Sequence, residues 1–230
     1  MPDPRAYGPG RTLALIAMVL LAAPAARSDE PAESAADRLG ALFDGLHERG
    51  VFHGSVLVAE GGEIVYEACF GAADDATGEP ITPRTRFRLA SVSKPITATA
   101  VLILAERGDL GLDDPVSRHL PRFPHGDVTI RQLLTHTSGL PGHHALFARY
   151  GDALPDGVVV TNDHVLDIHR DAAPEMAAPP GVRVDYNNLN YIVLAEIIER
   201  ASGRPFARVL REEIFAPAGM RDTEVCTTVH

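Results

Sequence analysis

One β-hairpin, in a chain otherwise patterned for helices, constrains the fold most. Residues 55–59 and 63–70 are strand-like runs, and Gly61-Gly62 between them is a two-residue hairpin signal. A two-stranded hairpin alone is marginally stable in water, so we expect further strands to complete its sheet. The given sequence reaches His230 without another run of this kind. The hairpin therefore predicts an α+β fold whose antiparallel sheet needs C-terminal strands that are missing here.

Helical periodicity lies on both sides of the hairpin. Apolar residues from Leu39 to Leu46 have the i, i+3, i+4, i+7 spacing of an amphipathic helix, and Gly50 is placed to stop it. After the hairpin, a polar connection is expected up to Arg88. Further helices are expected at residues 91–108, 130–134 (capped by Thr129), 163–169 and 189–202, and from Pro205 onward, with a loop at 141–160. The predicted order is helix, hairpin and a long helical lobe.

Length and charge exclude some classes of protein. The 230 residues fit one domain or two small lobes, and an apolar fraction of 45% is enough for a core. The formal net charge is −10, and no Lys/Arg cluster follows the N-terminus, which argues against nucleic acid as a partner. Cys69 and Cys226 lack the spacing of a metal or redox motif. The histidines lack metal-ligand spacing with carboxylates, so no metal site is predicted.

The first 25 residues have the pattern of a secretory signal peptide. Arg5 and Arg11 form the positive region, Leu13–Ala23 is the apolar region, and Ala23-Pro24-Ala25 fits a small-x-small cleavage site. The apolar run is about half of the roughly 20 residues that span a bilayer, so no stable membrane anchor is expected after cleavage. We therefore predict a signal peptide at 1–25, a flexible lead-in at 26–38, one domain at 39–230, and a periplasmic or secreted protein.

Ser91-Val92-Ser93-Lys94 places a hydroxyl and an amine three residues apart at the expected start of a helix. Residues i and i+3 share one helix face, so the Ser91 oxygen and the Lys94 nitrogen can meet. A serine becomes a good nucleophile when a neighbouring base takes its proton, and Lys94 is placed to be that base. The alternative is structural: Ser91 or Ser93 caps the helix, and Lys94 is a solvated residue of its first turn.

Asp185-Tyr186-Asn187-Asn188 is a second polar cluster, in a turn just before a predicted helix. Tyr186 offers a phenolic oxygen that can hold or relay a proton, and Asn188 offers an amide that can donate and accept. Beside a Ser–Lys pair, the tyrosine could protonate a leaving group or activate a water. The structural alternative is an asparagine N-cap with Tyr186 packed on the helix.

Three segments follow one another along the chain: Ser91–Lys94, then Leu133–Pro141, and then Tyr186–Asn188. In this order they resemble the serine β-lactamase and penicillin-binding-protein-like hydrolases. The resemblance is closest to the branch related to class C β-lactamases, which also contains esterases and D-amino-acid peptidases. It runs from about Leu39 to Met220 and implies a β-lactamase/transpeptidase-like α+β fold.

The resemblance implies a role for each site residue. Ser91 would be the nucleophile that forms an acyl-enzyme, and Lys94 its base or electrostatic partner. Tyr186 would relay the proton in acylation and deacylation, and Asn188 would contact the substrate or Lys94. Asn187 stands where the family commonly has Ser or Ala, a mild departure because this side chain need not face the cleft. No cofactor and no metal is implied.

His136 lies in the second of these segments, between Thr135 and Thr137. A histidine flanked by two hydroxyl residues could take part in chemistry. In the family, however, this stretch is scaffold, a turn that closes the helical lobe. We therefore interpret His136 as a structural residue.

A third family motif, Lys-Thr-Gly or His-x-Gly on a later strand, does not occur after Tyr191. That strand normally supplies a second oxyanion donor, and losing one such donor costs about 10²–10³ in rate. The resemblance therefore predicts a C-terminally truncated serine hydrolase that acts through an acyl-enzyme on an ester, amide or β-lactam. Its partners would be a small-molecule or peptide-like acyl substrate and a missing C-terminal half. The alternative is an inactive truncated or split fragment, or a non-catalytic ligand-binding module.

Overall fold

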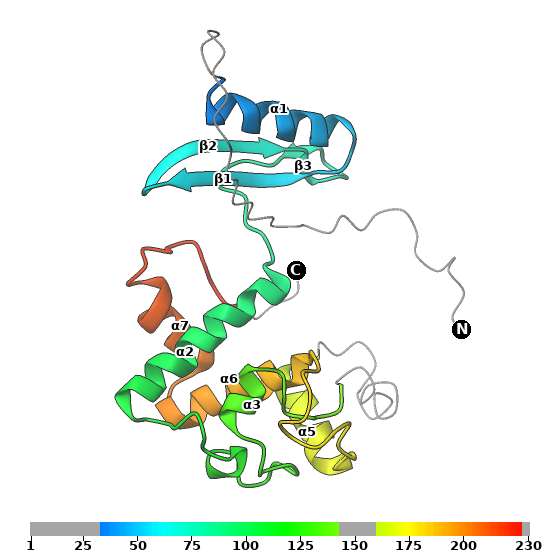
Figure 1. The fold of residues 1–230 in the computed structure, drawn as a ribbon, viewed down its shortest axis with the longest axis vertical. Coiled ribbons are helices and arrows are strands. Elements are labelled where there is room, and N and C mark those ends of the chain that lie inside the picture. The colour runs from blue at the N-terminus through cyan, green and yellow to red at the C-terminus, as the bar shows by residue number, and fades with distance from the viewer. Residues whose placement is uncertain (1–32, 143–159, 227–230) are drawn as a thin grey trace, which may run out of the picture. The chain divides into compact units, whose positions relative to one another are not determined.

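The computed structural model describes residues 33–142 and 160–226 (Figure 1). The chain divides into two compact units, with the boundary between Phe87 and Arg88. The predicted signal peptide and most of the predicted loop at 141–160 lie outside the described residues. The prediction of one hydrolase domain over 39–230 stays a prediction.

The first unit begins with α1 (Ala35–Glu48), which starts four residues before the predicted apolar run. A capping box explains the earlier start: Ser34 Oγ accepts the Asp37 N–H, and the Asp37 carboxylate accepts the Ser34 N–H. The helix ends before Gly50, whose φ of 67° is in the left-handed region that glycine tolerates. The predicted helix and its stop are therefore confirmed.

The predicted hairpin is confirmed as β1 (Gly54–Glu60) and β2 (Glu63–Phe70), which pair antiparallel across Gly61-Gly62. Gly61 and Gly62 both have positive φ, as a tight hairpin turn of this length requires. Among the described residues, no further strand joins this pair. The connection that follows was predicted to be a polar loop, but it contains a second short pair of strands, β3 (Ala72–Asp74) and β4 (Glu79–Pro80).

Helix α1 covers one face of the hairpin (Figure 1). Phe43 anchors this contact, because its ring packs against the rings of Phe52, Tyr66 and Phe70 at centroid distances between 5.1 and 6.3 Å. The helix thus supplies the packing that a hairpin alone lacks.

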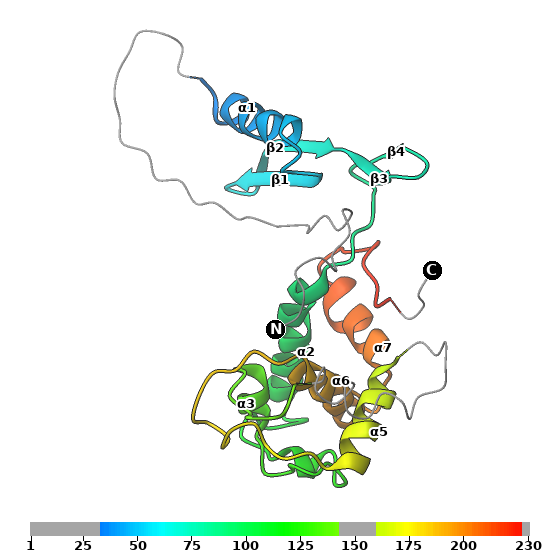
Figure 2. The same cartoon turned by 90° about the vertical axis from the view of Figure 1, so that its right-hand side faces the viewer.

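The second unit is helical. It contains, in order, the 3-10 turn η1 (Ala90–Val92), α2 (Ser93–Arg107), the 3-10 turn η2 (Val116–Arg118), α3 (Ile130–Leu134), α5 (Asn162–Ala172), α6 (Asn188–Ser202), α7 (Phe206–Leu210) and the π-helical turn η4 (Arg211–Phe215). Helix α6 packs against α2, α3, α5 and α7 (Figures 1 and 2). The predicted helices are therefore present, and α6 is the element that the others share.

Local sequence signals fix the ends of these helices. Thr129 caps α3 in a capping box, as predicted from its position before an apolar run. Gly108 and Gly203 end α2 and α6 in the left-handed conformation, with φ of 80° and 66°. No helix in the described part of the chain is long and apolar enough to span a bilayer.

The core of the second unit lies between α2 and α6. Their fully buried apolar side chains are Ala100, Val101, Leu104, Leu189, Val193, Leu194, Ile197 and Ile198. On α6, Ala195 is buried as well, next to Leu194 and Ile198. This packing holds the N-terminal ends of α2 and α6 in one rigid unit, which matters because the predicted site residues lie at those ends.

Replacing Leu104 by alanine is expected to lower the free energy of unfolding by about 2–5 kcal/mol, because it opens a cavity between α2 and its neighbours. Leu102 lies on the same helix but is 52% exposed, so Leu102→Ala is a matched control that should change stability by less than about 1 kcal/mol. Urea unfolding of the two variants measures the difference. Equal losses would contradict the assignment of the core.

His169 on α5 is completely buried, and neither of its ring nitrogens has a hydrogen-bond partner among the described residues. Its ring stacks on Phe123 at 4.9 Å and faces His125 at 5.4 Å. Burial, together with a smaller contribution from the nearby His125, lowers the pKa of His169 from 6.5 to about 4. Between these two pH values, the His169 ring is therefore neutral in the folded protein but protonated in the unfolded chain.

Stability should fall as the pH drops from 6.5 towards 4, because in this window the unfolded state binds a proton that the folded state does not. Between pH 7 and pH 5, His169 is expected to account for a loss of about 2 kcal/mol. Urea unfolding at both pH values measures this loss. Between pH 7 and pH 5, the free energy of unfolding of His169→Leu should fall by about 2 kcal/mol less than that of the wild type. A pH dependence identical to that of the wild type would contradict the prediction.

Candidate active site

The backbone before α2 forms a sharp turn that presents Ser91. Ala90 has a φ of 46°, an unusual value for a residue with a side chain, and Ser91 follows within the 3-10 turn η1. Ser93 Oγ donates to the Ala90 carbonyl oxygen at 2.6 Å, which holds this turn. Neither Ser91 nor Ser93 caps an N–H of α2, so the structural alternative for this stretch is wrong.

Three hydrogen bonds join the four predicted site residues. Lys94 Nζ donates to Ser91 Oγ at 3.1 Å, as the i, i+3 spacing predicted. Ser91 Oγ and Tyr186 Oη are 2.5 Å apart, although these residues are 95 positions apart in the sequence. Lys94 Nζ also donates to Asn188 Oδ1 at 2.7 Å. The structure therefore brings Ser91, Lys94, Tyr186 and Asn188 together in one continuous network.

The network favours the ionised form of Tyr186. Lys94 lowers the pKa of the Tyr186 phenol most, and the hydrogen bond with Ser91 lowers it further. Lys94 Nζ also lies 4.8 Å from the centre of the Tyr186 ring. Since Tyr186 is 57% exposed, its oxygen stays accessible while it contacts the Ser91 hydroxyl. A phenol whose pKa is lowered and which touches a hydroxyl is placed to take the proton of that hydroxyl.

Asn187 turns away from this network and serves the fold. Its Oδ1 accepts the Leu189 N–H at 3.0 Å and caps α6, while its Nδ2 donates to the carbonyl oxygens of Leu140 and Pro141. Asn187 is buried, with a relative exposure of 6%. The asparagine cap of the structural alternative is thus present at Asn187, while Tyr186 contacts Ser91 and Asn188 contacts Lys94.

His136, predicted to be a structural residue, contacts the turn that carries Tyr186. Its ring lies 4.6 Å from the Tyr186 ring and 5.3 Å from the Tyr191 ring, and its Nδ1 accepts the Asn187 N–H at 3.1 Å. The backbone explains the approach, because the Asp185 N–H donates to the His136 carbonyl oxygen at 2.7 Å. His136 and Tyr186 are 50 residues apart in the sequence and are brought together by this backbone hydrogen bond. No sequence pattern predicts such a contact, so the interpretation of His136 as scaffold did not include it.

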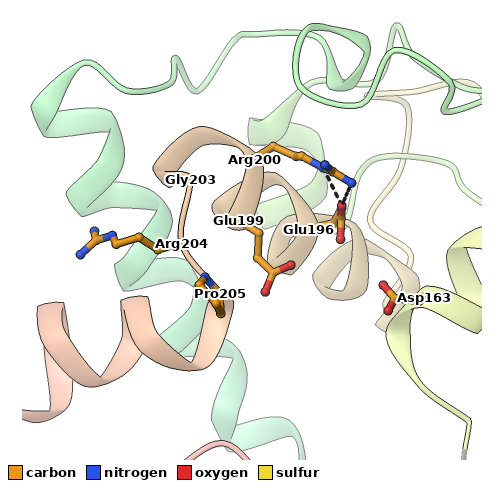
Figure 3. A pocket seen from close by; sticks show the side chains of 7 residues that line it. All are labelled: Asp163, Glu196, Glu199, Arg200, Gly203, Arg204 and Pro205. Atoms are coloured by element: carbon orange, nitrogen blue, oxygen red, sulfur yellow. Dashed lines mark hydrogen bonds and ion pairs between the residues drawn. The ribbon is translucent and has the colours of Figure 1, made fainter.

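A separate cavity of about 470 Å³ lies between α5, α6 and the turn before α7 (Figure 3). It is lined by Asp163, Glu196, Glu199, Arg200, Gly203, Arg204 and Pro205. Two of its acidic side chains already have partners: Glu196 pairs with Arg200 at 2.7 Å, and Glu199 Oε1 accepts the Phe206 N–H. None of the predicted site residues lines it. Within the described ranges, no cluster of three or more His, Cys, Asp or Glu side chains could hold a metal ion.

Comparisons with known proteins agree with the geometry. A sequence profile of the family described as Beta-lactamase matches residues 39–228. Penicillin-binding protein 4* of Bacillus subtilis is 41% identical over 81% of this chain, and Esterase EstB of Burkholderia gladioli is 42% identical over 83% of it. A penicillin-binding protein from Bacillus halodurans superposes with a TM-score of 0.69 at 33% identity, over 81% of this chain and 57% of that one.

The chain spans about half the length of the curated relatives it matches, covering 41% of the Bacillus subtilis protein and 52% of EstB. The match nevertheless extends over most of the chain and includes most of α1, the hairpin, the turn η1 that carries Ser91 and the turn before α6 that carries Tyr186. The α+β fold predicted from the sequence is therefore the β-lactamase/transpeptidase-like fold. The chain belongs to the Beta-lactamase family.

Proposed function

We propose that the protein is a serine hydrolase that acts through an acyl-enzyme on Ser91. The observation that carries the proposal is the continuous contact from Ser91 Oγ to Tyr186 Oη at 2.5 Å and to Lys94 Nζ at 3.1 Å. A serine is a weak nucleophile until a neighbouring group takes its proton, and here two candidate groups touch the same oxygen.

In the proposed acylation step, Ser91 Oγ attacks the carbonyl carbon of the substrate while Tyr186, as phenolate, takes the hydroxyl proton. Lys94, as an ammonium group, stabilises the phenolate and is itself held by Asn188. Collapse of the tetrahedral intermediate breaks the bond to the leaving group, which receives the proton from Tyr186. Water then attacks the acyl-enzyme, Tyr186 takes the proton of that water, and Ser91 recovers it as the acid product leaves.

The substrate class follows from the chemistry and from the relatives. One relative is named an esterase and two are named penicillin-binding proteins. We therefore propose an ester, amide or β-lactam as substrate, in the form of a small molecule or a peptide-like acyl compound. The signal-like pattern of residues 1–25 supports a periplasmic or secreted location.

A burst experiment tests the proposal. Mixing the full chain with p-nitrophenyl acetate should release p-nitrophenol in a rapid phase equal to the protein concentration, because acylation precedes slower hydrolysis. Ser91→Ala should show no burst, whereas Thr99→Ala, which removes an exposed hydroxyl from the following helix α2, should keep it. A wild-type chain that shows neither a burst nor turnover with esters, amides or penicillins would favour the non-catalytic alternative.

A further inference from the structure

The ring of His136 has one nitrogen that two donors share. Its Nδ1 lies 3.1 Å from the backbone nitrogen of Asn187 and 3.2 Å from Asn190 Nδ2. A backbone N–H can only donate, so Nδ1 must accept, and a nitrogen that accepts carries no proton. The folded site therefore requires a neutral His136 whose single ring proton is on Nε2.

The second donor is held in place by a buried chain of hydrogen bonds. The Leu140 N–H donates to Ser138 Oγ, and this hydroxyl donates to Asn190 Oδ1 at 2.6 Å. Ser138 and Asn190 are both essentially inaccessible to solvent. Because the Asn190 oxygen faces Ser138, its NH₂ group faces His136. The buried chain thus fixes the lone pair of His136 Nδ1 as the common acceptor.

Protonation of His136 would break this arrangement. The added proton on Nδ1 would face the Asn187 N–H and the Asn190 NH₂ group, and three donors would then point at one another. The Asn187 N–H belongs to the turn that carries Tyr186 and Asn188, so the turn would lose its contact with the His136 side chain. The Tyr186 ring, which packs on His136 at 4.6 Å, would lose its support at the same time.

The charged groups around His136 favour its neutral form. Burial lowers the pKa of His136 from 6.5, and Lys94 on α2 lowers it further. The other titratable groups that face the ring are the phenols of Tyr186 and of Tyr191 on α6. Asp185 donates its backbone N–H to the His136 carbonyl oxygen, but its carboxylate pairs with Arg183 at 3.0 Å.

We propose that His136 is a positioning residue that holds the turn of Tyr186, Asn187 and Asn188 against Ser91 only while its ring is neutral, so that acid releases Tyr186 and switches the site off. The inference rests on the proposed function of Ser91 and Tyr186 and adds a regulation of that site by pH. His136 itself touches neither Ser91 nor, in the proposed mechanism, the reacting atoms.

The state of the ring can be measured without turnover. In the ¹⁵N-labelled full chain, the His136 signals, identified by their loss in His136→Asn, should show an unprotonated Nδ1 at neutral pH. As the pH falls below 6.5, the Asn187 backbone amide should shift in the same titration step as His136 and lose its protection from hydrogen exchange. A protonated Nδ1 at neutral pH, or an Asn187 amide that does not follow His136, would overturn the proposal.

His136→Asn is the matched variant. Asparagine tolerates the left-handed backbone of this position, where φ is 56°, and its Oδ1 is attached to Cγ as Nδ1 is, so it can accept the Asn187 N–H. It does not titrate. His136→Ala, by contrast, leaves the Asn187 N–H without an acceptor and should slow the reaction of Ser91 at every pH.

The rate at which a fluorophosphonate modifies Ser91 provides the second readout. Below the pKa of His136, each pH unit should slow the modification of the wild type about tenfold more than that of His136→Asn. Only in the wild type can residue 136 become protonated and release Tyr186. Identical pH profiles would overturn the inference while leaving the proposed function intact. If the wild type is not modified at any pH, the proposed function fails, and the coupling of Asn187 to His136 in the titration still decides the positioning role.

Discussion

Ser91→Ala is expected to reduce hydrolysis of any accepted ester, amide or β-lactam by about 10³-fold or more, because it removes the atom that would form the acyl-enzyme. The hydroxyl is in contact with both Tyr186 and Lys94, and no other hydroxyl among the described residues is shared by these two side chains. The residual rate would come only from binding and from general electrostatic effects of the site. Steady-state rates with p-nitrophenyl acetate and with a penicillin measure the effect.

The fold should not be affected by this substitution. Ser91 is exposed and lies outside the core between α2 and α6, so its removal should leave the urea midpoint almost unchanged. Thr99→Ala provides the control for loss of an exposed hydroxyl from the adjoining helix α2. A Ser91→Ala variant that is stable and retains more than about a tenth of the wild-type rate would contradict the assignment of the nucleophile.

Tyr186→Phe is expected to lower kcat/KM by about 10²–10⁴-fold, because it removes the proposed base and leaves its ring packed on His136. The pH dependence should change as well. The pKa of Tyr186 lies below its ordinary value of 10, so wild-type activity should rise with pH as the phenolate forms, at a pH lower than a free phenol would require. The variant should lack this rise. Initial rates from pH 6 to 10 measure both effects.

Tyr191→Phe is the matched control. Tyr191 also lies close to Lys94, with 5.6 Å from Lys94 Nζ to its ring centre, but its phenol donates to the Leu134 carbonyl oxygen at 3.2 Å. Burial raises the pKa of Tyr191, so its phenol stays protonated where Tyr186 ionises. We expect Tyr191→Phe to change kcat/KM by less than about tenfold. Equal losses in the two variants would mean that the effect comes from packing around Lys94 and not from a base at Tyr186.

Short-range patterns predicted the elements that local physics determines. Helix α6 was predictable because its apolar spacing, its cap and its glycine stop at Gly203 all agree, and the hairpin was predictable because Gly61-Gly62 separates two strand-like runs. The β3–β4 pair was not predictable, because strands of two or three residues carry no periodicity.

Some contacts of the candidate site could likewise be predicted from local sequence, and others could not. The approach of Lys94 to Ser91 follows from their spacing on one helix face. The approach of Tyr186 to Ser91 has no local cause, because it depends on how α2 and α6 pack, and only the family resemblance predicted it. The strained turn at Ala90 and the contact of His136 with Tyr186 left no signal in the sequence, because alanine ordinarily avoids a positive φ and the pairing of residues 136 and 185 is made by the backbone.

The most direct test of the central claim is to locate a covalent adduct. Treating the full chain with a fluorophosphonate and mapping its peptides by mass spectrometry should show modification of Ser91, with displacement of fluoride. The modification should be lost in Ser91→Ala and strongly slowed in Tyr186→Phe. An adduct on another residue, or none at saturating reagent, would contradict the account of Ser91 as a nucleophile activated by Tyr186 and Lys94.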